Sequence, residues 1–389
     1  MTGGKIKLEI YLDNSATTAA YPECGDLVHS VMTKEYGNPS SLHRKGIEAE
    51  KIIKTAAKRI AAALKVSERE IFFLSGGTEG DNLAILGTAE AKRGKHIITS
   101  DIEHPAVLNT LKYLEKKGYE ISYIPVDKNG RCKICEFEKL IRKDTILVSV
   151  MLVNNEIGTI QPVAEMSEIL KKKNKNALFH VDAVQGFGKI PFSANSLGAD
   201  MITLSSHKIH GPKGMGALYI KNGTLIKPVI YGGGQQGNIR PGTENVPGIA
   251  GFGLAAEISH TDFEEKREKM MWLRNRLRDG IVREIPDISV NTPYENSAPH
   301  ILNVSFKGAK SEVVLHTLEN DGIYVSSGSA CSSHKKAPSY VLTAIGLSPE
   351  LIDGSIRFSL SEFTTQEEID YTLEKLKVAV SGIRRIMRK

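Results

Sequence analysis

Short apolar runs alternate with stretches of helical periodicity along most of the chain. The stretch 42–64 carries apolar residues at three- and four-residue spacing, among them Ile53, Ile60 and Leu64, which predicts an amphipathic helix. The predicted strands that follow are 71–74, 97–99, 121–126, 146–153, 178–181, 201–204 and 217–220, and the predicted helices between many of them are 79–93, 106–117, 135–142 and 163–173.

These strands are almost continuously apolar, and helices separate many of them. This order is typical of a mainly parallel sheet that is covered by helices on both faces, so the pattern predicts an α/β fold. In such sheets, ligands bind where the strands end and the loops begin. Polar residues directly after the predicted strands are therefore the first candidates for a functional site.

The pattern changes near residue 246, where a long helical stretch, 246–284, leads away from the alternating part. Beyond it we predict strands at 288–290, 301–306 and 356–360 and helices at 311–320, 338–346 and 365–388. This mixed order predicts a smaller α+β domain. We expect a large domain over 15–260, and a small domain made of 1–14 and 261–389.

Composition narrows the class of protein. The 389 residues are 41% hydrophobic and 25% charged, which is globular and excludes a disordered or collagenous chain. Lys and Arg number 51 against 45 Asp and Glu, and the excess is scattered, so it favours neither a nucleic acid nor a membrane partner. No apolar run approaches the ~18 residues of a membrane-spanning helix, and we expect no signal peptide. Four cysteines do not make a disulfide framework, so we expect a reducing, cytoplasmic location.

Lys208 follows the predicted strand that ends at Leu204, next to the hydroxyls of Ser205 and Ser206. A lysine just past a buried strand loses hydration, which lowers its pKa and favours a nucleophilic amine able to form a Schiff base. The alternative is a solvated surface lysine.

Asp182 ends another predicted strand, and Gln185 lies one turn further on. A carboxylate in this place can hold a proton on a heteroaromatic nitrogen, which pyridoxal phosphate needs in order to act as an electron sink. The alternative is an aspartate that caps a helix N-terminus.

The segment 75–82 combines Gly76, Gly77 and Thr78 between a strand and a helix. Glycines let the backbone approach a ligand closely, and free N–H groups at a helix start attract a phosphate. A plain strand-to-helix turn is the alternative. The dinucleotide and P-loop motifs are missing from the sequence, which argues against nicotinamide and nucleoside triphosphate ligands.

Cys331 stands in a run of small polar residues, 326–334, with His334 and Lys335 close by. Such a loop makes a thiol accessible, and the basic neighbours favour thiolate, whereas a structural cysteine more often sits in an apolar element. Cys132 and Cys135 have CxxC spacing, but no second pair accompanies them, so we interpret them as structural.

Taken together, the sequence resembles the cysteine desulfurase family, in the class V branch of pyridoxal-phosphate enzymes. The resemblance covers nearly the whole chain and rests on ordered motifs at 11–18, 36–43, 103–106, 153–158, 240–245 and 355–360. It implies the type I fold of PLP-dependent transferases, with a seven-stranded, mostly parallel sheet in the large domain, and pyridoxal 5′-phosphate as cofactor.

The resemblance also implies roles for individual residues. Lys208 matches the lysine that binds the cofactor covalently, Asp182 the partner of the pyridine nitrogen, and Gln185 the partner of the ring 3-oxygen. His104 matches the imidazole that stacks on the ring and moves protons. The matches to phosphate ligands are Gly77, Thr78, Ser205, His207 and, from a second subunit, Thr243. Asn155 and Arg357 match residues that hold the substrate, and Asn155 also matches a cofactor ligand. Cys331 matches the nucleophile.

The implied reaction converts L-cysteine to L-alanine and leaves the sulfur as a persulfide on Cys331. The implied partners are a second copy of the chain, forming a homodimer with shared active sites, and a sulfur acceptor such as an iron–sulfur scaffold protein or a tRNA- or cofactor-thiolation relay. The sequence does not name the acceptor, show whether an activating partner is needed, or distinguish cysteine from selenocysteine.

One departure from the family pattern is Gly80, where serine is frequent; we expect only a small change in helix stability from it. A class V aminotransferase and a selenocysteine lyase are the alternatives within the superfamily, although an aminotransferase needs no thiol. A non-catalytic sulfur-pathway or RNA-associated binding protein is the alternative of another class, and it gives no purpose to Lys208, Asp182, His104 and Cys331.

Overall fold

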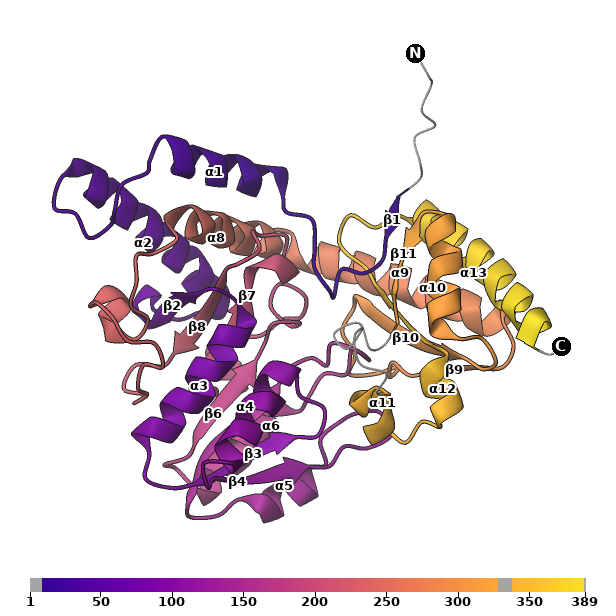
Figure 1. Cartoon of the computed structure of the whole chain (residues 1–389), viewed down its shortest axis with the longest axis horizontal. Helices are drawn as coiled ribbons and strands as arrows, with labels where there is room; N and C mark the ends of the chain where they lie inside the picture. Colours follow the sequence, from indigo (N-terminus) through magenta and orange to yellow (C-terminus); the bar gives the residue numbers. More distant parts are fainter. Residues whose placement is uncertain (1–8, 328–337, 388–389) are drawn as a thin grey trace.

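Seven strands form the central sheet of the computed structural model, which describes residues 9–327 and 338–387 (Figure 1). Their order is β2-β8-β7-β6-β5-β3-β4, with β8 antiparallel to β2 and β7 and the other pairs parallel. The mostly parallel prediction is thus confirmed. The strands are β2 (Ile71–Leu74), β3 (His96–Ser100), β4 (Glu120–Ile124), β5 (Thr145–Met151), β6 (Leu178–Asp182), β7 (Met201–Ser205) and β8 (Gly216–Ile220), each within two residues of its predicted ends.

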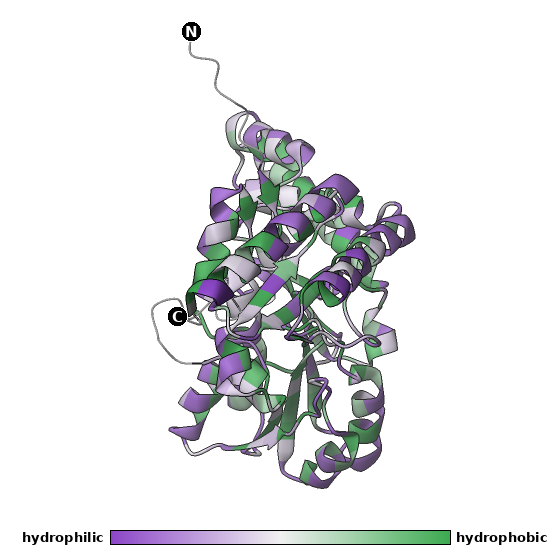
Figure 2. Cartoon of the chain, turned by 90° about the vertical axis from the view of Figure 1, so that its right-hand side faces the viewer, coloured by the Kyte–Doolittle hydropathy of each residue, from purple (hydrophilic) through white to green (hydrophobic). Residues whose placement is uncertain are grey.

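Helices cover both faces of this sheet because its strands are apolar on both sides. Along β5, Leu147 packs in one apolar cluster, whereas Val148 and Val150 pack in another. Figure 2 shows strands and inner helix faces as largely hydrophobic. The helices over the Leu147 face are α3 (Gly77–Ala91) and α4 (Pro105–Glu115), and those on the other cluster include α2 (Arg44–Leu64), α5 (Ile134–Leu140), α6 (Val163–Lys173), α7 (Ala194–Leu197) and α8 (Val246–His260).

Two features of the helices differ from the sequence-based expectation. The stretch 246–284 is two helices, α8 and α9 (Phe263–Glu284), because Asp262 between them adopts a left-handed conformation with φ +51°. Helix α1 (Pro22–Thr33) was not predicted; it packs on α8, and Cys24 and Val31 are its buried side chains.

A second, antiparallel sheet lies in the C-terminal part of the chain, in the order β12-β13-β10-β9, beside a parallel pair of β1 and β11. The predicted α+β character is confirmed, although α12 and the two-residue strands were not predicted. These elements are β1 (Ile10–Tyr11), β9 (Ile288–Val290), β10 (Ile301–Phe306), β11 (Ile323–Tyr324), β12 (Ser326–Ser327), β13 (Ser355–Ser359), α10 (Ser311–Asn320), α11 (Tyr340–Ala344), α12 (Pro349–Asp353) and α13 (Gln366–Met387).

The apolar packing supports the expected division of the chain. Ile10 and Leu12, from the first strand, belong to the same buried cluster as Leu302 and Phe358. Ile301 and Val341, however, pack into the cluster of the large sheet. The division into 15–260, and 1–14 with 261–389, therefore stays a prediction. Among the described residues, no helix is both long and apolar enough to cross a membrane.

Gly80 is more tightly constrained than helix stability alone requires. It lies in the N-terminal part of α3, and a Cβ added there would come within 2.7 Å of the Thr203 Cγ2 methyl on β7. Real Cβ atoms essentially never approach a neighbour this closely, so a larger residue at position 80 requires Thr203 to move.

We therefore expect Gly80→Ser to lower stability by about 1–3 kcal/mol, as overpacked cores do. Thr203→Ser removes the clashing methyl, so the double variant should recover part of the loss. Urea unfolding of cofactor-free protein measures both effects. Gly382→Ser on α13 is the matched control, because an added Cβ there meets nothing within 4 Å. A double variant no more stable than Gly80→Ser would contradict this packing argument.

Candidate active site

A cavity of about 340 Å³ lies at the carboxyl ends of β6 and β7, where a mostly parallel sheet is expected to bind its ligands. It is closed on one side by the start of α3 and on another by β13 of the small sheet. The cavity brings together ten of the residues singled out from the sequence, namely Gly77, Thr78, His104, Asn155, Asp182, Gln185, Ser205, His207, Lys208 and Arg357.

Lys208 ends a short 3₁₀ turn that follows β7 directly. Its Nζ donates hydrogen bonds to the main-chain oxygens of Ser15, at 2.6 Å, and Ala16, at 2.7 Å. These carbonyls belong to the segment after β1, so segments far apart in sequence meet at this amine. The contacts hold the amine inside the cavity, where a carbonyl ligand would meet it.

Asp182 is the last residue of β6 and is only 6% exposed. One carboxylate oxygen accepts a hydrogen bond from the Val184 N–H at 2.9 Å. Burial raises the pKa of Asp182, against the opposing effect of His104 and Lys208. Gln185, one turn on, donates from Nε2 to the Ser15 oxygen at 2.9 Å. The carboxylate and amide thus face one cavity from one β–α turn.

His104 caps the N-terminus of α4, and its Nδ1 accepts a hydrogen bond from the Ala106 N–H at 3.2 Å. Burial is the main cause that lowers the pKa of His104, with Lys208 adding to it and Asp182 opposing it. The neutral imidazole is therefore favoured. Because Nδ1 is the acceptor, the proton of the neutral ring lies on Nε2.

The start of α3 forms the end of the cavity that suits an anion. Helix N–H groups without helical partners begin at Gly77, and a Cβ at this position would come within 2.8 Å of Val184 Cγ2, so only glycine keeps the space open. A neighbouring cavity of about 430 Å³ continues from here along Lys213 and His207. Burial, with help from Lys208 and Lys213, lowers the pKa of His207 to about 4, so this ring is neutral and its Nδ1 lies 3.1 Å from Thr17 Oγ1.

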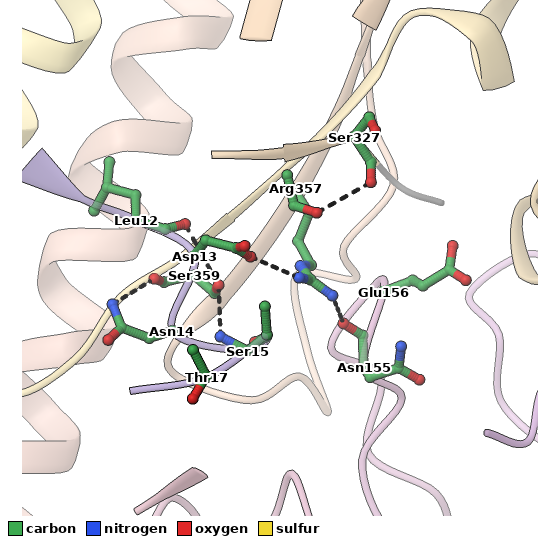
Figure 3. Close-up of polar contacts among 12 residues, drawn as sticks. Leu12, Asp13, Asn14, Ser15, Thr17, Asn155, Glu156, Ser327, Arg357 and Ser359 are labelled. Atoms are coloured by element: carbon green, nitrogen blue, oxygen red, sulfur yellow. Dashed lines mark hydrogen bonds and ion pairs between the residues drawn. The ribbon is translucent and has the colours of Figure 1, made fainter. Parts of the chain in front are cut away.

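Arg357 reaches the opposite wall from β13 and is 5% exposed (Figure 3). Its Nη1 donates to the Asn155 main-chain oxygen at 2.9 Å, and its Nη2 donates to Asp13 Oδ1 at 2.7 Å. Arg357 Nε and Asn155 Oδ1 are buried and lack hydrogen-bond partners among the described residues. Buried polar atoms without partners are rare, so both atoms are candidates to bind a ligand.

Two predicted site residues remain, Thr243 and Cys331. Thr243 is exposed and lines a third cavity, of about 280 Å³, together with Gln236 and Arg240. Arg240 connects the two regions, since its Nε lies 3.0 Å from the Glu79 carboxylate on α3. Cys331 lies outside the described residues. The strand before that segment, β12, pairs with β13 at Arg357.

The CxxC pair does not form a site in the described part of the chain. Cys132 is buried, and Cys135 is exposed. Burial raises the pKa of the Cys132 thiol, which disfavours a reactive thiolate. No three or more His, Cys, Asp or Glu side chains of the described residues are grouped as metal ligands would be.

Sequence reasoning missed three contributors to the site. Asp13 holds Arg357, Ser15 holds Lys208 and Gln185, and Asp81 lines the floor of the cavity. The motif 11–18 contains the first two, but a hydrophobic pattern gives no role to a carbonyl oxygen. Asp81 lies in a helix where an aspartate is ordinarily solvated.

The cavity fits pyridoxal 5′-phosphate, the cofactor that the resemblance implies. An amine and a carboxylate face its interior, as an aldehyde and a pyridine nitrogen require. At one end, the glycine-lined start of α3 provides N–H groups for a phosphate. At the other, the unpartnered Arg357 Nε and Asn155 Oδ1 remain for a substrate.

Comparisons with known proteins agree with this geometry. The family model described as "Aminotransferase class-V" matches residues 10–372. A cysteine desulfurase IscS of Dictyoglomus turgidum is 45% identical over 383 residues, covering 98% of this chain and 97% of its own. One from Methanosarcina thermophila is 46% identical over 377 residues, covering 96% and 93%.

Solved structures give the same result for the fold. A NifS-like protein superimposes with a TM-score of 0.91 at 43% identity, covering 96% of this chain and all of the other. A structure described as SspA in complex with cysteine has a TM-score of 0.80 at 33% identity, covering 92% of this chain and 100% of the other. The expected type I fold of PLP-dependent transferases is confirmed. The chain belongs to the class-V aminotransferase family, among the cysteine desulfurases, and its cofactor is pyridoxal 5′-phosphate.

Proposed function

We propose that this chain takes the sulfur from L-cysteine, releases L-alanine and passes the sulfur on as a persulfide of Cys331. The observation that carries the proposal is the single cavity that joins the Lys208 amine, the Asp182 carboxylate and the Arg357 guanidinium. Relatives named cysteine desulfurase at about 45% identity over nearly the full length support it.

Three groups of residues would hold the cofactor. Lys208 would bind its carbonyl carbon, Asp182 its ring nitrogen and Gln185 its ring 3-oxygen. His104 would lie against the ring, with Asn155 nearby. The phosphate would be bound by Gly77, Thr78, Ser205 and His207, and by Thr243 of a second subunit. When bound, the cofactor supplies an electron sink that stabilises negative charge on the substrate Cα.

Arg357 would bind the substrate carboxylate, and Asn155 would hold the substrate near it. Asp13 and the Asn155 carbonyl occupy the two terminal nitrogens of Arg357, which fixes the plane of the guanidinium while Nε lacks a partner among the described residues. A guanidinium held in one plane binds a carboxylate with little loss of side-chain entropy.

Lys208 would move the proton. Its amine, held inside the cavity by the Ser15 and Ala16 carbonyls, would act as the general base that removes the substrate Cα proton. Asp182, by staying ionised, keeps the ring nitrogen protonated. The neutral His104 ring carries its proton on Nε2, and His104 would exchange this proton with the substrate bound in the same cavity.

Cys331 would receive the sulfur. Its thiolate attacks the substrate sulfur; a sulfur–sulfur bond forms, the carbon–sulfur bond breaks, and the electron pair of the broken bond stays with the carbon fragment. Protonation of that fragment gives alanine. A small-residue loop suits this step, because the same thiol must then deliver its persulfide to an acceptor.

The assembly would be a homodimer. Large apolar side chains are exposed in two segments, with Tyr36 71% and Leu42 96% exposed in one, and Leu225 64% and Tyr231 83% exposed in the other. A second copy that covers them would also place Thr243 at the phosphate of the neighbouring site. Iron–sulfur scaffold proteins and thiolation relays are the proposed acceptors, and the cytoplasm is the proposed location.

The assay that tests the function is the incubation of cofactor-loaded protein with L-cysteine. Equal amounts of alanine and persulfide sulfur are expected. An oxo acid without sulfide would instead indicate an aminotransferase, and strong preference for selenocysteine would indicate a selenocysteine lyase. A colourless protein after addition of the cofactor would overturn every PLP-dependent alternative.

Cys331→Ala should keep the visible absorbance of the bound cofactor, because the thiol is not a cofactor ligand, and lose sulfide and persulfide production. Mass spectrometry of trypsin fragments maps the persulfide in the unaltered protein. Cys135→Ala is the matched control, since Cys135 is exposed, and it should keep full sulfur transfer. Full sulfur transfer by Cys331→Ala would falsify the assigned role.

Lys208→Ala should lose the covalent link to the cofactor. Borohydride reduction followed by mass spectrometry measures this link, which is expected at position 208 only. Lys213→Ala, which also borders the anion end of the site, should keep the link although it binds the cofactor less tightly. A reduced cofactor on another lysine would move the assignment there.

Arg357→Lys should raise KM for L-cysteine at least about tenfold while kcat changes less, because lysine keeps the charge but loses the planar arrangement of donors. Steady-state kinetics on the cofactor-loaded protein measure this. Arg276→Lys alters an exposed ion pair with Asp370 and should leave both constants unchanged. An unchanged KM in Arg357→Lys would remove Arg357 from the substrate site.

A further inference from the structure

Asp81 is a buried carboxylate at the floor of the cavity that none of the roles above uses. It lies on α3, one turn beyond Gly77, and is 1% exposed. It lines the same cavity as Asp182, and its Oδ1 has no hydrogen-bond partner among the described residues. A buried charged group without a cationic partner is costly, so its protonation state needs an explanation.

Strand geometry places Asp81 against three polar residues of the sheet. His180 and Asp182 are two residues apart on β6, so their side chains point to the same face. Thr203 on β7 pairs with Asp182 in the register and lies beside both. Helix α3 packs on β6 and β7 and brings Asp81 to this face.

A chain of hydrogen-bonding groups runs from Asp81 into the sheet. The Thr203 hydroxyl interacts with the Asp81 carboxylate and lies 2.9 Å from His180 Nε2. His180 Nδ1 lies 2.9 Å from Ser149 Oγ on the far side of the ring. Asp81 Oδ1 is 3.7 Å from His180 Nε2, which is too far for a direct hydrogen bond.

The charges around the two aspartates differ. The titratable groups that face Asp81 are Asp182 and His180 from β6 and Glu103 from the segment before α4. Burial is the main cause that raises the pKa of Asp81 well above its usual value; Asp182 and Glu103 raise it further, and the Thr203 hydroxyl opposes the rise. Burial also raises the pKa of Asp182, but His104, the Val184 N–H and Lys208 oppose that rise.

We propose that Asp81 is a positioning residue that holds a proton beneath Asp182, so that Asp182 is the ionised member of this pair. Two neighbouring carboxylates in a dry site share one proton, and the one next to cations stays charged. The proposal rests on the proposed function, because its consequence falls on the partner of the ring nitrogen. A second negative charge at Asp81 would favour protonation of Asp182.

The protonation state of Asp81 determines the direction of every hydrogen bond in the chain. Burial lowers the pKa of His180 to about 3, so the ring is neutral and has one donor and one acceptor nitrogen. A protonated Asp81 donates to Thr203, Thr203 donates to His180 Nε2, and Nδ1–H donates to Ser149. An ionised Asp81 accepts from Thr203 and reverses all three bonds, which puts the His180 proton on Nε2.

The tautomer of His180 in the cofactor-free protein tests the proposal directly. Nitrogen-15 NMR of histidine-labelled protein near pH 7 should show the proton on Nδ1, and Ser149→Ala should shift this signal and so assign it. A proton on Nε2 would overturn the proposal. The measurement needs no cofactor and no activity, so its outcome is separate from that of the proposed function.

A second test uses the pH dependence of the visible absorbance of the cofactor-loaded protein. Burial raises the pKa of Asp81 well above its usual value, so the visible absorbance of the unaltered protein should change as pH rises through that raised pKa and Asp81 loses its proton. Asp81→Asn is neutral at every pH and still donates to Thr203, so this transition should be missing from its profile. Asp144→Asn, in an exposed ion pair, is the control and should not shift the transition. Superimposed profiles of Asp81→Asn and the unaltered protein would overturn the proposal.

Discussion

The structure depends on placing an amine and a carboxylate in one largely dry cavity without neutralising either. Lys208 is held by two main-chain carbonyls, and Asp182 by a main-chain N–H. Fixed dipoles of this kind cost no reorganisation when a ligand binds, which is the usual origin of electrostatic catalysis. Asp182 ends β6, and Lys208 ends the turn that directly follows the adjacent parallel strand β7, so the sheet brings both groups to one edge.

The second sheet has a different part in the site. It carries Arg357 on β13, and the segment after β1 contributes Asp13 and the carbonyls that hold Lys208. In the proposed function, Arg357 would hold the substrate from this part of the chain, and Lys208 and Asp182 would hold the cofactor from the large sheet. Both ends of the cysteine-bearing segment lie close to this boundary, because β12 pairs with β13 at Arg357 and Ser339 donates to the Glu156 carboxylate at 2.6 Å.

The buried carboxylates beneath the cavity do not ionise independently of one another. Ionisation of one carboxylate changes the cost of ionising the next, and the Lys208 amine favours the charged form of Asp182. Gly80 and Thr203 belong to the same arrangement, because close packing of α3 on β7 brings the Asp81 side chain to the Thr203 hydroxyl. The close packing of α3 on β7 therefore also affects the pKa of Asp81.

The amino-acid sequence alone determined the alternating strands and helices, because apolar periodicity is a local property of the chain. It also indicated Lys208, Asp182 and Gly77, which directly follow predicted strands, and the ordered motifs indicated the family. The break between α8 and α9 was decided by the left-handed conformation of Asp262, which no periodicity reveals. The partners of Lys208 and Arg357 were decided only by the tertiary structure. The Ser15 carbonyl that holds Lys208 and the Asp13 carboxylate that holds Arg357 both come from the N-terminal segment, far from either residue in sequence. The role proposed for Asp81 likewise depends on burial and on the neighbouring carboxylates, which are properties of the folded chain.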